Sequence, residues 1–281
     1  MWVFVDSQRT NKVESLCTLE GLYNKSMLQL VFVVLLGWIA GAIINYLADV
    51  LPIKRRLNPP FCLNCDASQG LSNYFFWPRR CRVCGERRTW RVWLVELAAI
   101  GAAAWIWFSP PPRLNFWASL ALLIYFGVVV VIDMEYRLIL HPVSAAGSIL
   151  GFGTGIWLHG FKETIFGGIA GFGIMLLLYY FGALLIKIFR RWRTPHNSSP
   201  GEDDALGFGD VILSGVLGLI LGWPGILSGL VLTILLGGVV SFLYILVMLI
   251  TRRYRSTMAL PYGPFLIASA VLILFFRGIL Y

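Results

Sequence analysis

The chain has 281 residues, of which 58% are hydrophobic and only 13% are charged, and its mean hydropathy is +0.76. This balance excludes an ordinary soluble domain and indicates an integral membrane protein. The net charge of +9 suits anionic lipid headgroups, so no nucleic-acid partner is expected.

Eight apolar segments approach or exceed the length that a helix needs to cross about 30 Å of hydrocarbon. They cover residues 27–52, 92–108, 115–132, 138–158, 163–186, 210–222, 225–250 and 260–280. The second and sixth segments are short, which leaves the count open by one. Because the segments lack the period-two alternation of a barrel, the predicted fold class is all-α, a polytopic membrane protein.

Residues 1–26 lack the basic-then-apolar pattern of a secretory signal peptide, so the first apolar segment is expected to act as the insertion signal. We interpret residues 1–26 as an extension outside the fold or as the result of an upstream misassigned start, and we assign Cys17 no role. The expected division is an extension (1–26), a first transmembrane helix (27–52), a cysteine loop (53–91) and a seven-helix core (92–281).

Most of the 23 lysine and arginine residues fall on one side of the membrane when eight spans are assumed. Cytoplasmic loops of membrane proteins carry the excess of basic residues. The cysteine loop is therefore predicted to be cytoplasmic, and both termini are predicted to lie outside.

Four cysteines form two pairs in this loop. Cys62-x2-Cys65 and Cys81-x2-Cys84 are fifteen residues apart, a spacing typical of tetrahedral zinc sites. A cytoplasmic location argues against disulfides, which would require an inverted topology, and reduced thiols without metal are the other alternative. Four thiolates leave zinc no open position, so the predicted metal is structural and folds a loop that has no core of its own.

Two aspartates are predicted to lie at the same depth. Asp133 ends the third apolar segment and Asp210 begins the sixth, and alternating span directions place both at the cytoplasmic boundary. Two carboxylates in a dry site cannot both ionise cheaply, so they should share a proton and activate a water molecule. Gly207 and Gly209 lack Cβ atoms and are expected to let an extended substrate backbone approach. Alone, Asp210 would more often be interpreted as a helix N-cap.

Two further carboxylates, Asp49 and Glu96, lie at the inner ends of the first two spans, near Arg55 and Arg91. We interpret them as members of local ion pairs at the interface. The alternative is that they line a substrate entrance.

Several motifs occur together in one order along the chain. GFGD is followed by VIL, and ID ends an earlier span. GAIINYLADVLP occupies residues 41–52, CLNC and CRVC contain the cysteine pairs, WLVEL contains Glu96, and LPYGPFL occupies residues 260–266. Over about residues 27–280 this pattern resembles the GxGD aspartyl proteases of the prepilin peptidase type.

The resemblance implies that Asp133 and Asp210 are the catalytic aspartates and that Gly207 and Gly209 are the GxGD glycines. It implies cleavage of pilin or pseudopilin precursors at the cytoplasmic face of the bacterial inner membrane. The basic leader of such a precursor stays in the cytoplasm, and its apolar stem helix lies in the bilayer.

Bifunctional relatives also methylate the new N-terminal amine with S-adenosylmethionine, so the resemblance implies this activity too. Ile212 stands where the family often has a lysine, which removes a charge partner without changing the aspartates. The segment between the cysteine pairs lacks the proline- and serine-containing stretch of bifunctional members, and this difference concerns the second activity.

Two alternatives come from other classes of protein. One is a transporter or channel in which Asp133 and Asp210 bind a cation or relay protons, and the other is a zinc-stabilised scaffold. Carboxylates used in transport lie near the membrane midplane. The shared boundary position of these two favours the peptidase.

Overall fold

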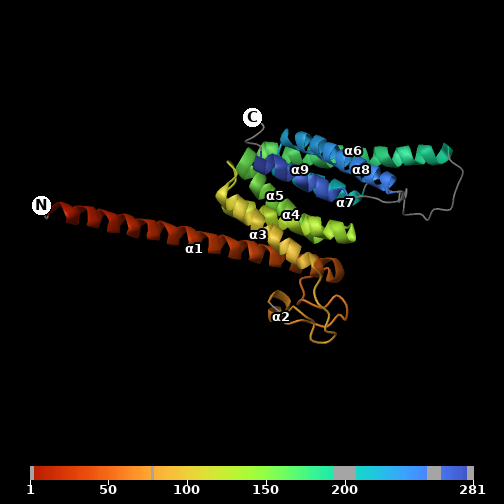
Figure 1. The fold of residues 1–281 in the computed structure, drawn as a ribbon. Helices are drawn as coiled ribbons and strands as arrows, with labels where there is room; N and C mark the ends of the chain where they lie inside the picture. Colours follow the sequence, from red (N-terminus) through yellow and green to blue (C-terminus); the bar gives the residue numbers. More distant parts are fainter. Residues whose placement is uncertain (1–2, 77–78, 193–206, 252–260, 277–281) are drawn as a thin grey trace.

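The computed structural model describes residues 3–76, 79–192, 207–251 and 261–276, and every element longer than an isolated bridge in these ranges is a helix (Figure 1). The described helices are α1 (Val3–Lys54), α2 (Leu71–Phe75), α3 (Arg91–Phe108), α4 (Phe116–Tyr136), α5 (His141–His159), α6 (Phe161–Trp192), α7 (Phe208–Leu221), α8 (Gly225–Ile250) and α9 (Gly263–Phe276). The predicted all-α fold class is confirmed.

Five of the described helices are long and apolar enough to cross a membrane. They are Met27–Lys54 within α1, α3, α4, Phe161–Leu185 within α6, and α8. Each of the eight predicted segments coincides with a described helix, but α7 and α9 have 14 residues each, or about 21 Å at 1.5 Å per residue. The chain is therefore a multi-helix membrane protein, while eight crossings stay a prediction.

The first helix is longer than the first predicted span. α1 has 52 residues and continues without interruption back to Val3. Its N-terminal part projects beyond the other helices, as Figure 1 shows at the left. The backbone of residues 3–26 is thus helical, and their side chains lie outside the described part of the structure. The expected division of the chain into four parts stays a prediction.

The helices pack in two groups that are joined by α9 and by a smaller contact between α4 and α5. α1, α3 and α4 contact one another, α5 and α6 contact each other and α7, and α9 contacts α4, α7 and α8. Both α7 and α9 are apolar and are covered by several neighbours. A helix that is apolar on all sides is typical of such a buried position.

One end of the bundle carries the loop of residues 55–90, and we call it the loop end. α1 ends there and α3 begins there. Short connections join α3 to α4, α4 to α5 and α5 to α6, so these helices alternate in direction. α4 therefore ends at the loop end. α7 begins there too, because Gly209 in its first turn packs against Ile139, in the connection that follows α4.

Glycines bring α6 and α7 into direct backbone contact. A Cβ atom on Gly167 would lie 2.4 Å from the Gly218 carbonyl oxygen, and one on Gly218 would lie 2.2 Å from the Gly167 oxygen. The Ser214 hydroxyl also donates to the Gly171 carbonyl at 2.9 Å. Small residues permit this close approach between membrane helices. The contact fixes the helix that carries Asp210.

Candidate functional site

Asp133 lies in the last turn of α4. The helix ends where Arg137 adopts a left-handed conformation, with φ of 52°, and donates its backbone N–H to the Asp133 carbonyl. The Asp133 residue is only 6% exposed. Its Oδ2 atom is buried without a hydrogen-bond partner among the described residues. A buried carboxylate oxygen without a partner is costly and requires an explanation.

Asp210 lies in the first turn of α7. Gly207 is the N-cap of this helix, in an extended conformation and without a side-chain capping bond. The Asp210 backbone N–H donates to the Gly207 carbonyl at 3.0 Å. Asp210 is the third residue of the helix, so its interpretation as the N-cap is wrong. The residue is 8% exposed.

The start of α9 completes the surroundings of both aspartates. Gly263 packs so closely against Asp133 that a Cβ atom would lie 2.6 Å from its Oδ2 atom. The neighbouring Tyr262 interacts electrostatically with Asp210. Three helices distant in the sequence therefore place two buried carboxylates at the loop end of the bundle.

The two glycines of the GFGD motif have different surroundings. A Cβ atom on Gly209 would lie 3.0 Å from the Ile139 Cβ, so Gly209 packs against the connection between α4 and α5. A Cβ atom on Gly207 would meet only the Asp210 carboxylate, at 3.6 Å. Close approach of a substrate backbone at these glycines stays a prediction.

The contribution of α9 was missing from the sequence-based site. LPYGPFL contributed only to the resemblance, and nothing in the sequence assigned Tyr262 or Gly263 to either aspartate. The available signal was a proline-flanked glycine entering an apolar segment, which indicates a close backbone approach.

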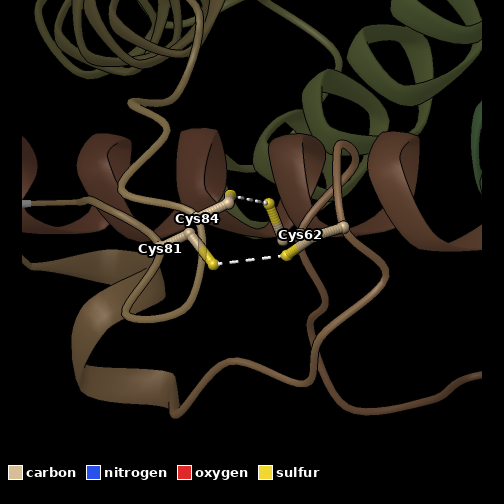
Figure 2. Close-up of side chains that lie close together, drawn as sticks. Cys62, Cys81 and Cys84 are labelled. Atoms are coloured by element: carbon tan, nitrogen blue, oxygen red, sulfur yellow. Dashed lines mark hydrogen bonds between the residues drawn. The ribbon is translucent and has the colours of Figure 1, made fainter.

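The four loop cysteines come together as the spacing predicts. Their sulfur atoms all lie within 4.8 Å of one another, with Cys62 and Cys84 at 3.6 Å and Cys65 and Cys81 at 3.6 Å. Figure 2 shows the sulfurs of the two segments facing each other across a small gap. All four cysteines are free thiols, since a disulfide would require about 2 Å.

Each cysteine pair lies on a tight turn of the same design. Cys62 and Cys81 donate their backbone N–H groups to residues 67 and 86, at 2.9 Å each. The residue after the second cysteine is left-handed in both turns, with φ of 59° at Asp66 and 72° at Gly85. The two turns present four sulfurs to one point.

This arrangement fits a zinc ion. Zn–S bonds of about 2.3 Å in a tetrahedron separate the sulfurs by about 3.8 Å, close to the 3.6 Å found here. Cys62, Cys65, Cys81 and Cys84 would hold the metal, which would have no open position for a substrate. The site is therefore suited to stabilise the loop.

A buried ionic network attaches this loop to the membrane helices. Asp49 of α1 is 3% exposed and pairs with Arg88 of the loop and Arg91 of α3. The Tyr74 hydroxyl donates to Asp49 at 2.6 Å, and burial together with the Asp49 charge raises the pKa of Tyr74. Arg91 also pairs with Glu135, which is two residues beyond Asp133 on α4. The network therefore connects the loop to the helix that carries Asp133.

Glu96 belongs to a second buried pair. The Arg79 guanidinium contacts Glu96 at 3.0 Å and lies over the Trp93 ring, 4.5 Å from its centre. The interpretation of Asp49 and Glu96 as ion-pair residues is confirmed, but only one of the two expected arginines takes part. Arg91 pairs with Asp49, whereas no ion pair of Arg55 is found among the described residues. The loop arginines 79 and 88 were missed as partners.

Comparison with known proteins identifies relatives of the chain. Residues 117–242, which include Asp133 and Asp210, match the Type IV leader peptidase family. The chain is similar to three proteins named prepilin leader peptidase/N-methyltransferase. The one from Pectobacterium carotovorum subsp. carotovorum is 28% identical over 241 residues, or 78% of this chain and 75% of that protein. No solved structure matches.

The other two relatives have lower sequence identity to this chain. The Burkholderia pseudomallei protein is 26% identical over 294 residues, or 89% of this chain and 86% of that protein. The Myxococcus xanthus protein is 24% identical over 233 residues, or 77% of this chain and 63% of that protein.

The cysteine cluster predicts a metal content that can be measured. Purified protein should contain about one zinc per chain, and Cys62→Ser should lose the metal and expose residues 53–91 to limited proteolysis. Asn64→Ser, between two of the ligands, should keep the zinc. Metal analysis that finds no zinc in the wild type, or full zinc in Cys62→Ser, would contradict the assignment.

The ionic network predicts a difference between two carboxylates. Asp49→Asn should lower the free energy of unfolding by about 3–5 kcal/mol, because it leaves two partly buried guanidinium groups underpaired. Asp66→Asn removes an exposed pair with Lys54 and should cost about 0–1 kcal/mol. Denaturation in detergent measures both, and equal stabilities would show that the network contributes nothing.

Proposed function

We propose that the chain is a type IV leader peptidase that removes the leader from prepilin or pseudopilin precursors, with Asp133 and Asp210 as its catalytic pair. The family match over residues 117–242 and the similarity to three prepilin leader peptidases support this proposal. The observation that carries this proposal is the burial of two carboxylates, from α4 and α7, at the same end of an apolar bundle.

The burial of the pair supports a shared proton. Two adjacent carboxylates away from water cannot both ionise cheaply, so one proton serves both. The ionised carboxylate takes a proton from a water molecule while the oxygen of that water bonds to the scissile carbonyl carbon. The protonated carboxyl polarises the same carbonyl. The C–N bond then breaks, and the leaving amine receives a proton from the pair. Asp133 Oδ2, which has no partner among the described residues, is available for this contact.

The position of the pair suits a substrate that is polar on one side and apolar on the other. Asp133 lies three residues before the end of α4, and Asp210 is the third residue of α7. The loop of residues 55–90 contains seven arginines, so the positive-inside rule supports a cytoplasmic location in the bacterial inner membrane. A precursor whose leader is cytoplasmic and whose stem is apolar would place its junction at this depth.

We further propose that the chain methylates the amine that cleavage creates. Its relatives are named as N-methyltransferases, and the cysteine loop lies at the end of the bundle that holds the aspartates. The neutral amine would attack the methyl carbon of S-adenosylmethionine and displace S-adenosylhomocysteine. The methylated amine would then lose a proton.

A transporter or channel is the competing function. Carboxylates that bind transported ions lie near the bilayer midplane, often where helices are broken. Asp133 and Asp210 lie instead in the terminal turns of two continuous helices. Their position favours an interfacial reaction.

The catalytic pair is tested by removing one carboxylate at a time. Asp133→Asn and Asp210→Asn should each slow cleavage of a purified pilin precursor by at least about a hundredfold, because general acid–base catalysis needs both groups. Glu163→Gln, an exposed carboxylate in the first turn of α6, is the control and should cleave normally. Normal cleavage by either aspartate variant would refute the pair.

The packing of α9 against Asp133 gives a second prediction. Gly263→Ala places a methyl group where only 2.6 Å is available to Asp133 Oδ2, and the resulting displacement should slow cleavage by about a hundredfold. Gly238→Ala adds the same group to α8 in open space and should leave the rate unchanged. Equal rates for the two variants would mean that the start of α9 does not hold Asp133 in place.

Methylation is measured separately from cleavage. Methyl-labelled S-adenosylmethionine should transfer label to the N-terminal residue of the cleaved product in the wild type. Asp133→Asn should give no labelled product, since the acceptor amine is not formed. Complete cleavage without label would show that the chain is a peptidase only.

A further inference from the structure

A long apolar groove lies on the lateral surface of the bundle. It has a volume of about 760 Å³ and runs between α3 and α4, with the last turns of α9 at the end opposite the loop. Two charged residues line it, Arg91 and Glu135, and both are at the loop end. The groove thus has an apolar length and a single polar end.

The length of the groove distinguishes a lipid acyl chain from a membrane-spanning helix as its occupant. On α3 its lining runs from Trp90 to Ile106, which is about 24 Å at 1.5 Å per residue. One leaflet of the hydrocarbon core is about 15 Å thick, so the groove continues past the bilayer midplane. A single acyl chain would fill about half of it, whereas a membrane-spanning helix would fill all of it.

The shape of the α3 wall suits a helix. Leu94, Ala98 and Ala102 follow one another at intervals of four residues and therefore lie on one face of α3. Ala98 is exposed and Ala102 is partly exposed. Small side chains on an open face let a second helix approach closely in a membrane.

The polar end of the groove adjoins the turn that carries Asp133. Val130 and Met134 line the groove and flank Asp133 along α4. Glu135, whose side chain is 34% exposed, pairs here with Arg91 and makes this end polar. An occupant that changes here from an apolar helix to a polar segment would match both parts of the groove.

We propose that this groove docks the apolar stem helix of the precursor, with the leader junction at the last turn of α4. This inference rests on the proposed peptidase function. It assigns recognition of the stem to α3 and α4, and it places the start of the leader beside the Arg91–Glu135 pair.

Filling the groove should weaken binding of the precursor. Ala98→Trp should raise the KM for the precursor about tenfold and leave kcat within about twofold, because it removes binding common to ground state and transition state. Ala102→Leu is a milder second variant and should raise KM in the same direction. Val239→Trp adds the same bulk to an exposed position on α8 and should change neither constant. An unchanged KM in both groove variants would overturn the proposal.

Photo-crosslinking locates the stem directly. A photoreactive phenylalanine derivative replaces either Ala98 in the groove or Phe242 on α8, which is 66% exposed, in vesicles of phosphatidylethanolamine and phosphatidylglycerol that contain a pilin precursor. Position 98 should give at least about ten times more precursor adduct than position 242, with the adduct on the stem. Cleavage is followed in the same samples.

The cleavage readout separates the two proposals. If the precursor is still cleaved, equal amounts of adduct at the two positions, or only lipid adducts at position 98, would overturn the proposal that the groove docks the stem helix. Failure of the wild type to cleave the precursor would reject the proposed function, and the groove assignment with it.

Discussion

Two buried carboxylates at the same end of an apolar helix bundle are the constraint on which the rest of this structure depends. Like charges at short range repel strongly where the dielectric constant is low. Asp133 and Asp210 are each less than one-tenth exposed, and a proton on one of them would reduce the repulsion. The proposed function uses this proton.

The bundle holds these groups from two sides. On one side, the backbone contact between Gly167 and Gly218 fixes α7 against α6. On the other side, Arg91 connects α4 to Asp49 and so to the cysteine loop. The loop has no hydrophobic core of its own, and four thiolates converging on one point explain how it keeps a fixed structure. The cysteine loop and the aspartate pair therefore form one connected assembly at the loop end.

Much of this arrangement follows from the sequence because its signals are local. Apolar runs predict helices, and the spacing of the cysteines predicts their cluster. Counting spans also predicts that residues 133 and 210 lie at the same membrane boundary, since helices that alternate in direction fix the side on which each helix end lies.

Other features could not be predicted because they depend on lateral packing. The α9 helix is apolar on all sides, so its sequence does not show which neighbours it contacts. The proline-flanked Gly263 indicates a close backbone approach, but not that Asp133 is the residue approached. Arg79 and Arg88 lie in an irregular loop without periodicity, and their carboxylate partners are 17 and 39 residues away in the sequence. The groove between α3 and α4 is likewise a property of how the helices are arranged.

The shared proton is tested most directly by infrared spectroscopy of the carboxyl groups in purified protein at neutral pH. The account predicts the C=O stretch of one protonated carboxyl in the wild type, and the loss or shift of this band in both Asp133→Asn and Asp210→Asn. A spectrum without a protonated carboxyl, or a band unchanged in both variants, would show that the two aspartates do not share a proton.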